Sequence, residues 1–140
     1  MTDPDTLAGD FRIALMRLTR RLRAERGPAE LSHTQSTVLG VLERCGPMTA
    51  GALAASEQVQ PPSMTRVIVF LEDAGLVSRT ADPIDRRQVR VTLTDLGRQT
   101  VLETRALREA WLARRLEQLT TEEREILRAA TTIVQRLVDK

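Results

Sequence analysis

The chain has 140 residues and a formal net charge of only +2, with 41% hydrophobic and 29% charged residues, which indicates one soluble globular domain. Aromatic residues make up 2% of the chain, which disfavours a protein that binds single-stranded nucleic acid by stacking bases on aromatic side chains. The single cysteine excludes an intramolecular disulfide. Because the sequence shows neither a basic signal segment nor an apolar run long enough to cross a bilayer, we expect a cytoplasmic protein with no membrane partner.

A first helix is predicted from Leu7 to Arg26, because apolar residues recur there at helical spacing. The pair Gly27-Pro28 ends it, and residues 1–6 are expected to form a frayed tail. The other side of this helix carries six arginines: Arg12, Arg17, Arg20, Arg21, Arg23 and Arg26. We interpret them as a solvated face with internal ion pairs rather than as a phosphate-binding surface.

Two shorter helices are expected next. Ser32 and Gln35 have the spacing of a capping box, so a helix begins there and stops at Gly46. Thr49 then caps a helix that runs through Ala55. Residues 56–60 form the turn into the following helix.

The next helix has the features of a DNA-recognition helix. Its start is marked by two prolines, which suit a first helical turn, and Gly75 ends it. One apolar stripe at helical spacing predicts its buried face: Met64, Val67, Ile68 and Leu71. Its other side presents Pro62, Ser63, Thr65 and Arg66. A short helix with this division suits insertion into a DNA major groove.

A two-stranded wing is predicted directly after that helix. Residues 89–93 alternate between apolar and polar, as a half-buried strand does, and residues 76–80 supply an apolar, β-branched partner strand. The connection contains Asp82-Pro83 and then Asp85-Arg86-Arg87, which is turn chemistry that carries exposed cations. The pattern is that of a winged helix-turn-helix, whose tip arginines reach phosphates or the minor groove.

Two apolar-faced helices complete the chain. Thr94 caps a long helix to about Leu119, and Thr120 with Glu123 forms a capping box for the last one. Such helices have little to bury against within one winged-helix chain, so we expect a homodimer. Each recognition helix would then read one half-site, with the two about 34 Å apart, on a pseudo-palindromic operator.

The stretch DPIDRRQVRVTLTDLG resembles the wing of the MarR family of bacterial transcription regulators, and GALAASEQVQPPSMTRVIVFLEDAGLVSR is similar to its helix-turn-helix. The resemblance covers nearly the whole chain. It implies a single domain of residues 1–140 with a mostly α winged-helix fold. Within it, residues 32–97 form the lobe that binds double-stranded DNA, and residues 7–26 and 98–138 form the dimerisation helices.

Thr65 and Arg66 are the first candidates for contacts to base edges and nearby phosphates, with Pro62 and Ser63 at the approach surface. The alternative for Arg66 is an ion pair with Glu72 or another surface acid. Of the wing cations Arg86 and Arg87, one is expected to enter the minor groove or grip phosphate, while the other pairs with Asp85. The resemblance also implies that Asp85 holds the wing tip in shape.

The resemblance further implies a small phenolic or anionic effector, bound between the dimerisation helices and the DNA-binding lobe, although no motif marks that cavity. One histidine makes a metal site improbable; for His33 we favour helix-start packing or exposure over a place in an effector pocket. Trp111 is expected at the dimer interface rather than on a ligand.

The leading hypothesis is therefore a homodimeric repressor released from its operator by a small molecule. The alternative is an oxidant-sensing repressor of the same fold that acts through Cys45, although we favour a buried, inert thiol there. The sequence has no glycine-rich phosphate loop, no metal-ligand cluster and no nucleophile–base pair. We therefore expect neither an enzyme nor a bound cofactor.

Overall fold

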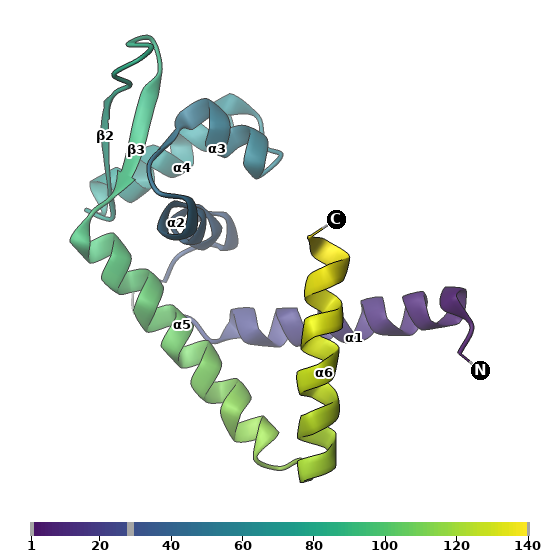
Figure 1. The fold of residues 1–140 in the computed structure, drawn as a ribbon. Helices are drawn as coiled ribbons and strands as arrows, with labels where there is room; N and C mark the ends of the chain where they lie inside the picture. Colours follow the sequence, from purple (N-terminus) through teal and green to yellow (C-terminus); the bar gives the residue numbers. More distant parts are fainter. Residues whose placement is uncertain (1, 28–29, 140) are drawn as a thin grey trace.

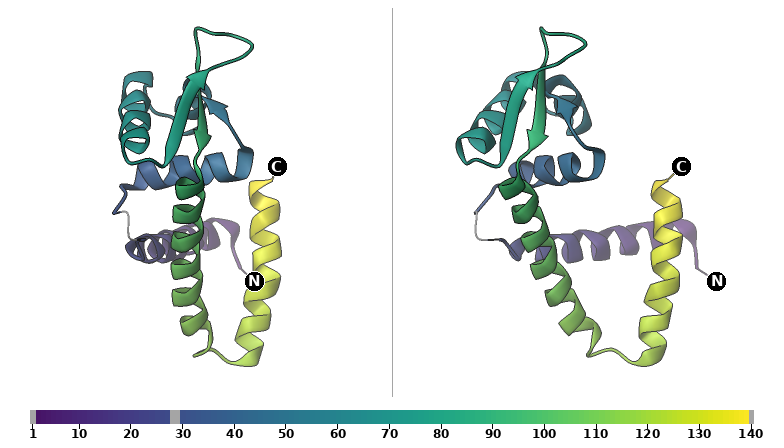
Figure 2. Two further views of the ribbon diagram at one scale, coloured as in Figure 1. Left: turned by 90° about the vertical axis from the view of Figure 1, so that its left-hand side faces the viewer. Right: turned by 60° about the vertical axis from the view of Figure 1, so that its left-hand side comes forward.

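The computed structural model describes residues 2–27 and 30–139. Nine elements follow one another along the chain (Figure 1): α1 (Pro4–Ala24), α2 (His33–Cys45), β1 (Met48–Thr49), α3 (Ala50–Ser56), α4 (Pro61–Asp73), β2 (Val77–Ala81), β3 (Val89–Leu93), α5 (Asp95–Leu116) and α6 (Thr121–Val138). Elements α2 to β3 make one lobe, and α5 leads away from it to α6, while α1 crosses beneath the lobe (Figures 1 and 2). The predicted mostly helical winged-helix fold is confirmed.

Local capping places most helix starts where they were predicted. Ser32 and Gln35 form both halves of a capping box, at 3.2 and 2.9 Å. Thr120 and Glu123 do the same, and Thr49 accepts the N–H of Ala52. These contacts join residues three positions apart, so they depend on sequence spacing alone.

The expectation of a frayed tail over residues 1–6 is wrong for Asp3 to Thr6, because α1 already begins at Pro4. Met1 lies outside the described residues. The Asp3 carboxylate accepts the N–H of Thr6 at 3.0 Å, and Pro4 occupies the first helical position, where its missing N–H costs nothing. The helix ends at Ala24, two residues before the predicted end. Pro28, part of the predicted stop signal, lies outside the described residues.

The wing belongs to a three-stranded antiparallel sheet with the order β1-β3-β2. The predicted pair is present, with Val77 opposite Leu93. The third strand, β1, pairs Met48 with Val91 and corrects the two-stranded expectation. It is only two residues long, so it has no alternation that a sequence pattern could reveal.

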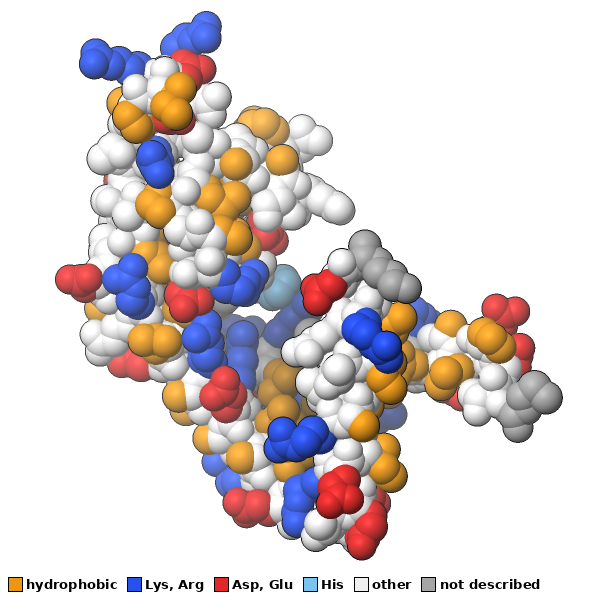
Figure 3. Space-filling model, in the orientation of Figure 1, with side chains coloured by type: hydrophobic (Ala, Val, Ile, Leu, Met, Phe, Trp, Pro, Cys, Tyr) orange, Lys and Arg blue, Asp and Glu red, His pale blue; other side chains and the backbone are white. Residues whose placement is uncertain are grey.

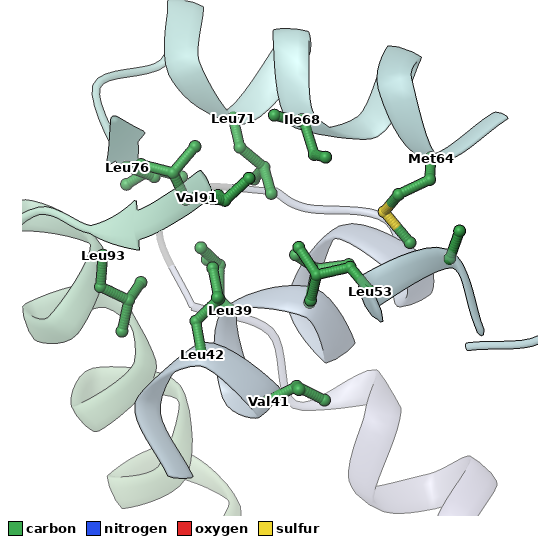
Figure 4. Close-up of a cluster of buried hydrophobic side chains, with 13 residues drawn as sticks. Leu39, Val41, Leu42, Leu53, Met64, Ile68, Leu71, Leu76, Val91 and Leu93 are labelled. Carbon is green, nitrogen blue, oxygen red and sulfur yellow. The ribbon is translucent and has the colours of Figure 1, made fainter. Parts of the chain in front are cut away.

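The core of the lobe lies between α2, α3, α4 and the sheet (Figure 4). It includes the predicted stripe of α4, with Met64, Ile68 and Leu71 fully buried and Val67 partly buried. Gly75 has φ +77° and turns the chain from α4 toward the sheet, a conformation that glycine adopts without steric cost. Because this stripe of α4 packs into the core, the opposite face of the helix is exposed.

The helices outside the lobe bury little. Neither α1 nor α6 has a buried residue, and α5 has only Gly97, Thr100 and Trp111. Apolar side chains therefore lie open along α1 and α6, and Figure 3 shows several of them on the face in view. No helix among the described residues combines the length and the apolar character that a membrane span would require.

Candidate nucleic-acid interface

The exposed side of α4 presents all four side chains predicted there: Pro62, Ser63, Thr65 and Arg66. They are exposed because the opposite stripe of the helix faces the core. The prolines limit what the helix start can donate, since Pro61 and Pro62 have no N–H group. Met64 already donates its N–H to Gln60. The N–H and hydroxyl of Ser63 are thus the donors that this end of the helix offers.

Thr65 and Arg66 differ in what they offer a ligand. The Thr65 hydroxyl donates to the carbonyl oxygen of Pro61 at 3.0 Å. This contact uses its only proton and leaves its oxygen lone pairs and its methyl group facing outward. Arg66 retains its guanidinium donors, because no acidic group within residues 2–27 or 30–139 lies within ion-pairing distance of it.

The alternative pairing of Arg66 with Glu72 is wrong. Glu72 instead accepts from Arg79 on β2, at 2.9 Å. This hydrogen bond lowers the pKa of Glu72 below its ordinary value and raises the pKa of Arg79. Arg79 comes near Glu72 only because β2 returns along α4, so helical spacing gives no sign of the pair.

The wing tip is held by contacts within the turn. The N–H of Asp82 donates to the carbonyl of Gln88 at 2.9 Å, and Gln88 donates back to the carbonyl of Asp85. The Asp85 carboxylate accepts both the backbone N–H and the Nε of Arg87, at 3.1 and 3.2 Å. The backbone hydrogen bond is the main cause that lowers the pKa of Asp85, and the side-chain bond adds to it.

These contacts separate the two wing arginines. Arg87 is tied through Nε to Asp85, although its side chain is still 93% exposed. Arg86 has no acidic partner in the described part of the chain. Figure 3 shows cationic side chains projecting from the wing tip, the point of the lobe farthest from the turn between α5 and α6.

The lobe as a whole is not basic. Residues 32–97 contain six arginines and seven acidic residues, a formal net charge of −1. A positive field on the side that carries Arg66 and the wing tip therefore depends on where individual arginines lie rather than on net charge. One of the six, Arg79, is neutralised by Glu72.

A second site lies between α1, α2 and α5. A cavity of about 110 Å³ adjoins a wider one of about 290 Å³, and Thr100, Thr104 and Arg108 line both. Arg23, Arg26 and His33 line the smaller one. Two of the six arginines predicted on the first helix, one on α1 and one just beyond its end, therefore face a cavity rather than only solvent. The buried Nε of Arg108 has no hydrogen-bond partner among the described groups. Among residues 2–27 and 30–139, no three or more His, Cys, Asp or Glu side chains are grouped so that they could hold a metal ion.

Two expectations about single residues are wrong. Cys45 is exposed rather than buried, since it is the last residue of α2, where the helix ends. Trp111 is 9% exposed within one chain. The guanidinium carbons of Arg21 and Arg115 lie 4.7 and 5.3 Å from its ring centre. It therefore packs between α1 and α5 within the chain, which leaves little of its surface exposed.

Sequence relatives cover the full length of the chain. The family model described as MarR family matches residues 31–89. A HTH-type transcriptional regulator of Mycobacterium tuberculosis is 46% identical over 141 residues, covering 100% of this chain and 99% of the relative. The HTH-type transcriptional repressor MdtR of Bacillus subtilis is 31% identical, and the match covers 93% of this chain and 85% of MdtR.

Solved structures share the fold. A protein of Pseudomonas aeruginosa PA01 has a TM-score of 0.86 at 36% identity, covering 100% of this chain and 99% of that one. A mutant of S. aureus MepR was solved bound to an oligodeoxyribonucleotide. It has a TM-score of 0.70 at 22% identity, and the match covers 93% of this chain and 96% of MepR. The MepR likeness shows the fold alone, whereas the sequence relatives show more: the chain belongs to the MarR family of HTH-type transcriptional regulators.

Proposed function

We propose that this DNA-binding regulator is a homodimeric repressor of a pseudo-palindromic operator and that a small anionic molecule releases it. The observation that carries the proposal is the exposed face of α4, with Thr65 and with an Arg66 that has no acidic partner among residues 2–27 and 30–139. The same lobe carries the arginine-tipped wing (Figure 3). MdtR is named a repressor, and the MepR mutant was solved with an oligonucleotide. Both support repression through duplex DNA.

A second copy of the chain is the expected cover for α1 and α6. Within one chain these helices bury no residue, yet Ile133 and Leu137 on α6 are 49% and 66% exposed. Burying apolar area of this kind is the main driving force for association. A two-fold dimer would present both α4 helices to one duplex, about one helical turn apart.

The contacts to DNA follow from the groups that each side chain has free. Arg66 can donate two parallel hydrogen bonds to a guanine edge, and Thr65 can accept from a base amino group or touch a thymine methyl. Pro62 and Ser63 lie at the approach surface, where the Ser63 N–H suits a phosphate. Arg86 extends to the minor groove, Arg87 grips phosphate with its remaining donors, and Asp85 keeps the tip in shape.

The cavity between α1, α2 and α5 is the proposed effector site. The smaller cavity is lined by three arginines and one glutamate, Glu30. This excess of positive charge, together with the Nε of Arg108 that has no partner among the described groups, favours a carboxylate or phenolate. Helix α2 belongs to the lobe and α1 to the dimerisation region, so an occupant between them changes the angle between the two. The effector then favours a spacing of the α4 helices that no longer matches the operator.

A mobility-shift assay on duplex DNA from upstream of the protein's own gene tests the main proposal. We expect a complex that survives excess random-sequence duplex, with a footprint of two half-sites related by a dyad. Equal competition by the random duplex would contradict it. Benzoate should weaken the complex more than neutral benzyl alcohol, and Arg108→Ala should remove that difference.

A second candidate function rests on the exposed thiol of Cys45. An oxidant-sensing repressor would lose its operator on peroxide treatment, whereas the Cys45→Ser variant would keep it. Equal retention by both proteins would exclude this candidate and leave the effector-released repressor.

A further inference from the structure

The wing tip carries an apolar side chain that neither the core nor the dimerisation helices use. Ile84 is 95% exposed, the highest value among the exposed large hydrophobic side chains of the described residues. It stands in the same turn as Arg86 and Arg87. An isolated exposed isoleucine on a surface needs no explanation by itself, so its setting decides whether it has a role.

That setting is rigid. The N–H of Ile84 donates to the Asp82 carboxylate at 3.0 Å, and Pro83 before it has a restricted φ. The turn is closed by the bond from Asp82 to Gln88 and by the Asp85–Arg87 contacts. The exposed position of Ile84 is therefore built into the turn and does not result from a loose loop.

No other part of the proposed assembly reaches this side chain. The wing tip lies at the opposite end of the molecule from the α5–α6 turn (Figures 1 and 2). A second copy that covers α1 and α6 would leave the tip uncovered. Under the proposed function the neighbouring arginines address the minor groove and its flanking phosphates, and Ile84 stands in the same turn.

We propose that Ile84 enters the DNA minor groove together with the wing arginines and packs against the sugars of its walls. This inference rests on the proposed binding of duplex DNA. Minor-groove proteins use isoleucine among the apolar side chains that they insert between base steps; here the same kind of side chain would lie along the groove walls instead. Both walls can touch it only where the groove is narrow, as in A-tracts. Ile84 would thus make the wing prefer A·T-rich operator flanks without any hydrogen bond to a base.

The test uses the full-length protein and labelled duplexes from upstream of its own gene, with the outer flanks made either A·T or G·C. We expect Ile84→Ala to weaken binding roughly tenfold on A·T flanks, since each of the two wings then buries less apolar surface. The loss on G·C flanks should be smaller. Ile84→Leu, which keeps the apolar volume, should bind within about twofold of wild type.

The salt dependence separates Ile84 from the arginines. An apolar side chain displaces no counterion, so Ile84→Ala should keep the wild-type slope of log K against log salt, whereas Arg86→Ala should reduce it by about 0.9 for each phosphate that Arg86 neutralises. Unchanged affinity of Ile84→Ala, an equal loss on both flanks, or a changed slope would overturn the inference about Ile84 alone. If wild type binds no duplex, the proposed function fails and the inference with it.

Discussion

Thr65 and Arg66 are neighbours on α4, but the hydrogen bonds around them leave them with different chemistry. Thr65 donates its only hydroxyl proton to the Pro61 carbonyl, so it can offer a ligand an acceptor oxygen and a methyl group. Arg66 keeps its fork of donors, because Glu72 is occupied by Arg79. Two adjacent side chains can thereby read different features of neighbouring base pairs.

Replacing single arginines should separate base reading from backbone binding. Arg66→Ala should cost about 1–3 kcal/mol on the best operator and relax the preference at the base pair that Arg66 reads. Arg87→Ala should weaken binding to all sequences alike and lower the salt slope. Titrations of both variants on the operator and on a random duplex measure these effects. If neither variant loses affinity, both assignments are wrong.

The Asp85 hydrogen bonds predict how the wing responds to acid. Because the folded-state pKa of Asp85 lies below its ordinary value of 3.8, its contribution is present above that value and disappears as pH falls through the folded-state pKa. Asp85→Asn should differ in unfolding free energy from wild type by a constant amount between about pH 5 and 8. The difference should shrink in stronger acid. A difference that instead varies around neutral pH would show that another group holds the tip.

At the scale of the elements, the sheet and α5 are joined by residues 93–97, which have the pattern Leu-Thr-x-x-Gly. Thr94 caps α5 by accepting the N–H of Gly97, and its hydroxyl donates to the carbonyl of Gly75 at 2.6 Å. A Cβ on Gly97 would overlap the carbonyl oxygen of Leu76. Helix α5 can start this close to the backbone of Leu76 only because residue 97 has no side chain. This contact explains the glycine of the motif.

Gly97→Ala should therefore destabilise the protein by roughly 1–3 kcal/mol or more, since the obstacle is backbone that cannot turn aside. Gly51→Ala on α3 is the matched control: its added methyl group meets open space, and alanine should gain about 0.5–1 kcal/mol there. Urea unfolding at one fixed protein concentration measures both. Equal stability of the two variants would show that α5 can shift to accommodate the Cβ.

Across the whole chain, positive charge is divided unevenly between the lobe and the helices outside it. The lobe of residues 32–97 has a net charge of −1, while the rest of the chain holds fifteen cations and twelve acidic residues. The excess of positive charge therefore lies outside the lobe, where Arg23, Arg26 and Arg108 line the cavity. DNA binding would depend on a few arginines at the far end of the lobe.

Charges placed on the apolar face of α6 should dissociate the proposed dimer. The lobe should stay folded, because its core contains no residue of α6. We expect Ile133→Glu with Leu137→Glu to give a monomer in sedimentation analysis, with the helical circular-dichroism signal of the lobe retained. Operator affinity should fall by more than tenfold, since a monomer can hold only one half-site at a time. Gln135→Glu, on the other side of α6, is the control and should remain dimeric. A dimeric double variant would place the interface elsewhere.

Local sequence patterns were sufficient to predict most of the helix starts, the inward stripe of α4, strands β2 and β3 of the wing and the exposed tip arginines. Each of these depends on contacts three or four residues apart, or on alternation along one strand. The predicted recognition side chains lie on the exposed face for the same reason, and their roles on DNA remain predictions.

The contacts between elements could not be predicted in this way. Packing of the folded chain paired Glu72 with Arg79, added β1 to the sheet, buried Trp111 between α1 and α5, and left Cys45 exposed. It also formed the cationic cavity from three helices that are distant in sequence. Such contacts are set by how whole elements pack, and packing depends on the combined shape of many side chains, which no single stretch of sequence contains.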